Sequence, residues 1–299
     1  MPVANGRRGW ELTAIRTLAA GMIEKEDRLI SQKASVRLLL ALTLFVAVVF
    51  FSLPRIPQPV AYHSFADQRT YLGIANFYNV VSNLPFAVIG LWGLVFLLKS
   101  NSGRANEHFM DPREHWPYLL VFVGLLLTAF GSSYYHLDPN NARLVWDRLP
   151  MTIAFMSMVA AVLAERISLR LGLCLLPILL LVGISSVLQW YASEARGAGD
   201  LRFYAAVQVY SALVLLVAPF LRTPYSRGSD LWMVVGFYIL AKALETLDKP
   251  IFAIGHTVSG HTLKHLAGAA AGYCILRMVQ KRRRLTTQPA CPRLGYEVR

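Results

Sequence analysis

The residues in this sequence that are best placed for chemistry are His261 and His265, which lie four positions apart in an apolar segment. At that spacing both side chains project from one face of a helix, one turn apart. Such a pair can hold a divalent metal such as zinc if a third ligand and an open position for water come from elsewhere. The alternative is two histidines with ordinary hydrogen-bond partners or at the surface. Within a membrane span the functional interpretation gains weight, because an ionisable residue there is costly.

A third histidine, His136, ends the stretch GSSYYH, and Ser132 lies four residues before it on the same expected helix face. Asp147 follows eleven residues after His136, at the start of the sequence DRLPM. Each has an ordinary explanation alone: an interfacial histidine, a serine that packs helices, and an aspartate favoured by the dipole at a helix start. Three histidines, a serine and an aspartate converging from three helices predict a reactive site.

This set of residues predicts metal-assisted amide hydrolysis. Three neutral imidazoles hold zinc and leave a fourth position for water, whose pKa the metal lowers from ~15.7 towards ~7. Asp147 would accept the proton of the water and later pass it to a departing amine, while Ser132 would donate to the developing oxyanion. Apolar helices around the site would form a cleft for a long acyl chain, so a lipid amide fits better than a peptide.

The composition indicates a polytopic membrane protein with an all-α fold. Of 299 residues 55% are hydrophobic and 16% charged, and the mean hydropathy is +0.44. The formal net charge is +13, but the basic residues gather at the ends and in alternate short loops, which indicates topology and no nucleic-acid partner. The widely separated Cys174, Cys274 and Cys291 predict neither a disulfide framework nor a cysteine metal site.

We expect eight membrane-spanning helices, a seven-helix bundle plus one extra N-terminal helix, since a span needs about 20 apolar residues. The excess of Lys and Arg in alternate segments places both termini in the cytoplasm, which puts the histidines in the outer half of the membrane. The expected domains are a cytoplasmic tail at 1–35, the extra helix at 36–53, a hydrolase domain at 67–278 and a basic cytoplasmic tail at 279–299. The expected spans are approximately 36–53, 76–98, 116–136, 146–164, 169–189, 202–221, 230–248 and 255–278.

Two of these spans carry further polar residues. A polar stripe at three- to four-residue steps favours hydrogen bonds between helices over direct contact with substrate. In the seventh span Lys242 and Glu245 lie one turn apart, which predicts an ion pair, and either Glu245 or Asp248 is a candidate partner for a zinc-bound histidine. The members of the polar stripe are Asn76, Asn79, Ser82 and Asn83.

The motifs NxxNxxSN, GSxxxH, DxLPM and HxxxH, in this order, resemble those of the alkaline ceramidase family of the CREST membrane-hydrolase superfamily. The resemblance covers residues 67–278 and is that of a bacterial-type member with an extra N-terminal helix. It implies a seven-helix bundle that holds zinc through His136, His261 and His265. It also implies that Ser132 stabilises the oxyanion and that Asp147 activates water.

The chain departs from this family at its calcium site. The acidic amino-terminal loop that binds calcium in eukaryotic members has no full counterpart, because only Asp67 precedes the polar stripe and Asn76 stands where a glutamate is usual. The resemblance therefore implies zinc and leaves calcium and the acyl substrate open.

Two other classes also stay open: a receptor or lipid-binding protein with structural zinc, and a b-type cytochrome whose histidines ligate haem. The expected partners are membrane lipids and a lipid amide, a ceramide or similar N-acyl lipid, and the sequence does not determine the oligomeric state.

Overall fold

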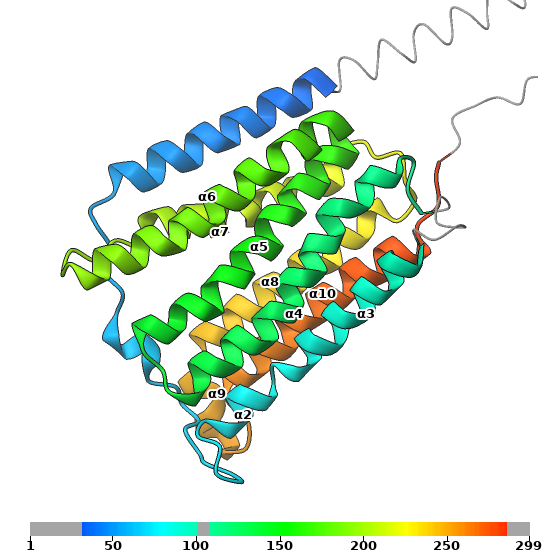
Figure 1. Ribbon diagram of the computed structural model, residues 1–299. Helices are drawn as coiled ribbons and strands as arrows, with labels where there is room; N and C mark the ends of the chain where they lie inside the picture. Colours follow the sequence, from blue (N-terminus) through cyan, green and yellow to red (C-terminus); the bar gives the residue numbers. More distant parts are fainter. Residues whose placement is uncertain (1–31, 101–107, 286–299) are drawn as a thin grey trace, which may run out of the picture.

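The computed structural model describes residues 32–100 and 108–285, and within these ranges the chain forms helices and loops without a β-strand. The long helices run side by side as a bundle (Figure 1). Most of the two expected tails, including Cys291, lies outside the described residues. The helices are an N-terminal helix Gln32–Ser52, α2 Phe77–Val81, α3 Leu84–Ser100, α4 His115–Leu137, α5 Asn141–Arg166, α6 Leu169–Ala195, α7 Arg202–Val217, α8 Leu231–Thr246, α9 Asp248–Gly255 and α10 Gly260–Lys281.

Six helical segments in the described ranges are long and apolar enough to cross a membrane, as expected of a multi-pass membrane protein. The all-α membrane fold is thereby confirmed. The last two expected spans are not among the six, since α8 has 16 residues and α10 carries polar residues around its histidines. Both nevertheless pack against each other within the bundle, and the count of eight stays a prediction. The six segments are Gln32–Ser52, Phe77–Lys99, Pro112–Leu137, Asn141–Arg166, Leu169–Ala195 and Arg202–Phe220.

The N-terminal helix lies at the edge of the bundle, beside α6 and α7 (Figure 1). Its Gln32 side chain donates to the carbonyl of Ile167 at 2.6 Å, and its Thr43 hydroxyl lies 3.3 Å from the hydroxyl of Tyr210 on α7. Most of its side chains are exposed, and the helix contributes nothing to the central cavity described below. The extra helix is therefore peripheral to the site.

The expected span at 76–98 is broken into α2 and α3. The side-chain amide of Asn83 donates to the carbonyl of Asn79 at 2.8 Å, and Pro85 has no N–H to offer the carbonyl one turn before it. Polar side chains that bond to nearby backbone compete with the helical ladder. The break turns the polar stripe towards α4 and α10.

Two other helix starts also differ from expectation. The last helix begins at Gly260 instead of 255, because His256 adopts a left-handed conformation (φ 51°) and Ser259 caps α10 by accepting from the backbone N–H of Thr262. Helix α5 begins at Asn141, five residues before the expected start, because the Asn140 side chain caps it. Asp147 therefore lies in the second turn of α5, and its explanation as a helix-start carboxylate is wrong.

Candidate active site

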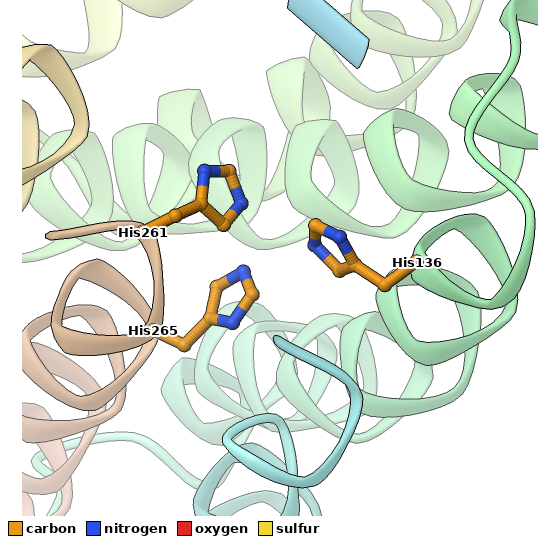
Figure 2. Close-up of side chains that lie close together, drawn as sticks. All are labelled: His136, His261 and His265. Carbon is orange, nitrogen blue, oxygen red and sulfur yellow. The ribbon is translucent and has the colours of Figure 1, made fainter. Parts of the chain in front are cut away.

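The structure brings His136 of α4 together with His261 and His265 of α10 (Figure 2). The centroids of the three rings lie 4.9 Å from one another. One nitrogen from each ring can be chosen so that all three lie within 4.8 Å. The side chains are buried, and Phe65 packs against the rings of His136 and His261 at 4.6 and 4.5 Å. Residues that are 125 positions apart in the chain thus form one cluster.

The start of α10 is held in place by backbone contacts. Asp248 accepts a hydrogen bond from the backbone N–H of His261 at 2.7 Å, and its other oxygen accepts from the N–H of Ala66 at 2.9 Å. Gly260 allows α8 to approach, since a Cβ there would lie 2.3 Å from the carbonyl oxygen of Leu244. Asp248 therefore positions the helix that carries the histidines and does not contact an imidazole through its carboxylate, which removes it as the candidate partner of a histidine ring.

Ser82 orients the ring of His265. Its Oγ lies 2.7 Å from Nδ1 of His265 and 3.2 Å from the carbonyl oxygen of Asn79. The hydroxyl can satisfy both contacts if it donates to the carbonyl and accepts from Nδ1–H. That tautomer leaves a lone pair on Nε2, the form that a metal ligand needs.

The stripe that contains Ser82 was expected to join helices, and its hydrogen bonds confirm this: Asn76 donates to the carbonyl of His136, and Asn79 accepts from the hydroxyl of Thr262. The contact from Ser82 to a candidate ligand was not foreseen. Nothing in the spacing of the stripe indicated which member would face α10.

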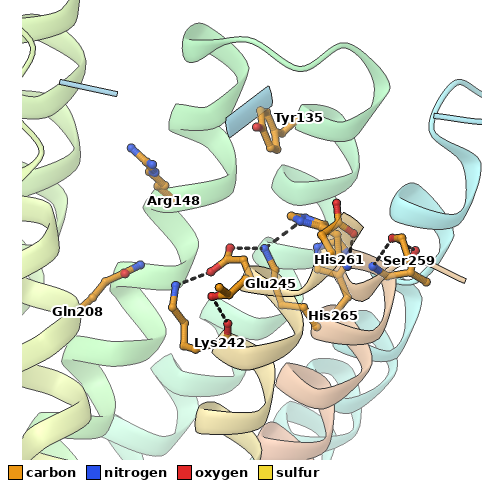
Figure 3. Close-up of polar contacts among 12 residues, drawn as sticks. Tyr135, Arg148, Gln208, Lys242, Glu245, Ser259, His261 and His265 are labelled. Carbon is orange, nitrogen blue, oxygen red and sulfur yellow. Dashed lines mark hydrogen bonds and ion pairs between the residues drawn. The ribbon is translucent and has the colours of Figure 1, made fainter. Parts of the chain in front are cut away.

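Lys264 is a second residue at the site that the motifs did not predict. Its Nζ lies 3.2 Å from Nε2 of His261 and 3.0 Å from a carboxylate oxygen of Glu245. Glu245 also pairs with Lys242, which confirms the ion pair expected within α8. Dashed lines in Figure 3 mark this series of side-chain contacts from Lys242 through Glu245 to His261. Glu245 therefore contacts His261 only through Lys264. The sequence did carry a signal for Lys264, because an ionisable residue between two histidines of an apolar helix is costly unless it is functional.

The residues present fit a zinc ion. Nδ1 of His136 is buried and has no hydrogen-bond partner among the residues described, which is unusual for a buried polar atom and is expected of a metal ligand. Three imidazole nitrogens that can surround one point form the donor set of a zinc site with an open position. His136, His261 and His265 would hold the ion.

Ser132 and Asp147 meet beside the histidines because α4 and α5 pack closely. Both side chains are buried and line the same cavity. A Cβ on Gly131 would lie 1.9 Å from the carbonyl oxygen of Trp146. That carbonyl lacks its helical donor, because the residue four positions on is Pro150. Gly131 and Pro150 thus both allow the close approach of α4 and α5. The carbonyl of Trp146 faces the Cα of Gly131, which carries no side chain.

An apolar cavity of about 320 Å³ opens next to these groups. Ser132, Asp147 and His265 line one end. On α4, α5, α8 and α10 the lining positions extend over about three turns towards the opposite end of the bundle, about 16 Å at the helical rise of 1.5 Å per residue. The apolar lining includes Phe86, Val121, Leu125, Met151, Phe155, Met158, Val234 and Ile275.

In the loop before α2, Arg69 binds the carboxylate oxygens of Asp67 that a calcium site would use as ligands. Arg69 donates to both carboxylate oxygens of Asp67 at 2.8 and 2.7 Å and to the carbonyl of Thr257 at 2.7 Å. Burial acts to raise the pKa of the Asp67 carboxyl, but the hydrogen bonds from Arg69 outweigh it and hold the pKa below its usual value. In this arrangement the acidic residue of the loop is engaged by a side chain of the same chain.

Comparison with known proteins places the chain in a family. A protein-family profile described as Ceramidase matches residues 69–242, and the chain belongs to this family. A segment of 84 residues is 29% identical to the protein described as "Putative alkaline ceramidase dcd3A" from Dictyostelium discoideum, covering 26% of this chain and 28% of that protein. The profile includes Ser132, His136 and Asp147, whereas His261 and His265 lie beyond its end. The fold brings these two residues to the matched part.

Proposed function

We propose that the protein is a zinc-dependent intramembrane hydrolase that cleaves the amide bond of a ceramide or a similar N-acyl lipid into a fatty acid and an amine. The observation that carries the proposal is the apolar cavity that has Ser132, Asp147 and His265 at one end. A zinc ion with a purely structural role would not require a carboxylate, a hydroxyl and a lipid-sized cavity beside its ligands. Membership of the Ceramidase family supports the same reaction.

Zinc bound by the three histidines would supply a Lewis acid that polarises the amide carbonyl and makes water more acidic. The Asp147 carboxylate takes the proton of the attacking water. The oxygen of the water forms the new bond to the acyl carbon, and Ser132 donates to the carbonyl oxygen as negative charge develops there. The C–N bond then breaks, and Asp147 passes its proton to the departing amine.

The shape of the cavity supports an acyl chain as the occupant. Its depth of about 16 Å is about half the thickness of a hydrocarbon core of ~30 Å, which is the length of one lipid chain in one leaflet. Its lining beyond Ser132 and Asp147 is mostly apolar, so burial of a chain there is favourable. We place the hydrolase domain at 67–278, with both termini cytoplasmic and the histidines in the outer half of the membrane. Reporter fusions that locate residue 290 outside the cell would refute this orientation.

The Asp147→Asn substitution tests the catalytic role. The amide is nearly isosteric but cannot accept the proton of water, so zinc content and fold should persist while hydrolysis falls by ~10² to ~10⁴. Ser132→Ala should lower kcat by ~10² to ~10³, the usual loss for one oxyanion donor. The assay is release of fatty acid from a panel of ceramides and other N-acyl lipids in detergent, with metal measured on the same samples.

Three outcomes decide between this proposal and its rivals. Wild-type activity in the Asp147→Asn protein would overturn the role of that residue. Absence of hydrolysis by zinc-loaded wild type across the panel would favour a receptor or lipid-binding protein. A Soret band in the purified protein would indicate a cytochrome.

A further inference from the structure

Arg148 is a buried cation that forms no ion pair with any residue the structure describes. It follows Asp147 on α5, is 4% exposed and lines the cavity. Its Nη2 donates to the side-chain oxygen of Gln58 at 2.7 Å. Its Nε and Nη1 are buried and have no hydrogen-bond partner in the described part of the chain, where Arg148 also forms no ion pair. Burial of a charged group without such partners is costly, so the donors point to a ligand.

Three aromatic rings hold the guanidinium in place. Its central carbon lies 4.1 Å from the ring centroid of Trp190, 4.6 Å from that of Tyr204 and 5.5 Å from that of Tyr62. Ring faces attract the cation but do not neutralise its charge or satisfy its N–H groups. The aromatic cage therefore preorganises Arg148 without giving its Nε and Nη1 a hydrogen-bond partner.

The other charged groups that line the cavity do not balance Arg148. Lys242 and Lys264 both pair with Glu245, and Asp147 is the remaining carboxylate among the lining residues described. Three cations therefore face two anions, before any charge from a metal is added. A bound anion would correct this excess. Figure 3 shows Arg148 on the opposite side of Glu245 from His261.

The position of Arg148 indicates which part of a substrate carries the anion. Neighbouring positions on a helix differ by only 1.5 Å along the axis but point about 100° apart. Arg148 thus lies at the level of Asp147 and faces α6 and α7, while the apolar lining extends from that level towards the other end of the bundle. The acyl chain occupies the apolar extension, so a group that meets Arg148 belongs to the amine side of the amide.

We propose that Arg148 selects N-acyl lipids whose amine part carries a carboxylate or a phosphate, by donating from Nε and Nη1 to its oxygens. This inference rests on the proposed amide hydrolysis, and it makes Arg148 a specificity-determining residue. A guanidinium suits oxyanions of both kinds, because it presents several donors in a fixed plane.

The test is a competition between substrates that share one acyl chain: an N-acyl glycine, an N-acyl ethanolamine phosphate and a neutral N-acyl ethanolamine. The ratio of their kcat/KM values in one mixture does not depend on the fraction of protein that is folded. Wild type should prefer one or both anionic lipids, and Arg148→Gln should lower the ratio of anionic to neutral hydrolysis by ~10- to ~100-fold, the usual loss of a charged hydrogen bond. Arg148→Lys should fall in between. The arm that loses more identifies carboxylate or phosphate.

Arg166→Gln is the matched control. Arg166 is a buried arginine of the same helix that donates to the carbonyls of Ala218 and Leu221 and does not line the cavity. Its substitution should leave the substrate ratio unchanged, even if the protein melts earlier. A ratio that is equal in wild type and Arg148→Gln, or a wild type that prefers the neutral lipid, would overturn the inference while leaving amide hydrolysis intact.

A binding measurement separates this inference from the proposed function. The melting temperature of metal-free protein is recorded with the N-acyl glycine and with the neutral N-acyl ethanolamine. Greater stabilisation by the anionic lipid in wild type and in Arg166→Gln, lost in Arg148→Gln, supports anion recognition even if no lipid is hydrolysed. Equal stabilisation by both lipids in all three proteins refutes it.

Discussion

The two ends of the bundle both bury charged side chains, but they satisfy them differently. At the far end, away from the histidines, Arg282 is 1% exposed and pairs with Glu165, whose carboxylate also accepts from Tyr118. Its Nε donates to the carbonyl of His108 at 2.7 Å, and one of its nitrogens is without a partner in the described residues. At the histidine end Arg148 leaves two nitrogens unpartnered and forms no ion pair among the residues described.

This difference indicates that the buried charges at the far end stabilise the fold, whereas those at the histidine end serve a function. The far-end cluster joins α4, α5 and the segment after α10, and its charges are compensated within the protein. Among the unpartnered atoms at the histidine end, Nδ1 of His136 adjoins the cavity and two donors belong to Arg148, which lines it. Because buried polar groups are normally paired, those left unpaired beside a cavity indicate ligands. Substitutions at the two ends should therefore have different consequences.

The largest expected effect is on metal binding. His136→Ala should weaken zinc affinity by more than ~100-fold and reduce hydrolysis to background, because loss of a ligand costs more than loss of a ligand's hydrogen-bond partner. Ser82→Ala, which removes only the contact to His265, should cost ~10- to ~100-fold. Metal content after dialysis against graded zinc buffers measures both. Wild-type zinc affinity in the His136→Ala protein would remove that residue from the site.

The second expected effect is on stability at the far end. Glu165→Gln leaves Arg282 buried without its charge partner, which should lower the free energy of unfolding by about 3–5 kcal/mol. The folded protein should retain its zinc and its kcat/KM, since Tyr118, Glu165 and Arg282 do not line the cavity. Thermal melting in detergent, with metal content and activity on the same sample, checks the separation. Loss of zinc at unchanged stability would contradict it.

A smaller effect that couples packing to chemistry is expected at Gly131. A Cβ there meets the carbonyl of Trp146 at 1.9 Å, so Gly131→Ala should push α4 from α5, cost about 1–3 kcal/mol and disturb the position of Ser132 relative to Asp147. Gly236→Ala is the control, because a Cβ on Gly236 meets no atom within 4 Å. It should be neutral or slightly stabilising. Similar activity and melting temperatures in the two variants would show that the close approach is not required.

The smallest expected effect concerns the pH dependence of the loop before α2. Because the folded-state pKa of Asp67 lies below its unfolded value, its carboxylate stabilises the fold above about pH 4 and this contribution is lost as pH falls through the folded-state pKa. Arg69→Gln should remove it and flatten this part of the curve of melting temperature against pH. A curve for Arg69→Gln parallel to that of wild type from neutral pH down to this acid region would refute the contribution.

Local sequence patterns were enough to predict much of the fold and part of the candidate site. Hydropathy and the placement of basic residues predicted an all-helical membrane fold, and spacing alone put His261 beside His265 and Ser132 on the face of His136. These features depend on helical periodicity and residue type, which act over a few positions. Where side chains compete with the backbone, at Asn83 and Asn140, the expected helix boundaries were displaced.

The tertiary structure decided which groups meet across the bundle. The contact of Ser82 with His265 joins residues 183 positions apart, and that of Arg148 with Gln58 joins residues 90 positions apart. Neither is encoded in a local period, because each depends on how close neighbouring helices pack and how each is rotated about its axis. Residue type and spacing thus predicted which groups of the chain could do chemistry, whereas helix packing decided that Ser82 orients a histidine and that Arg148 lines the cavity.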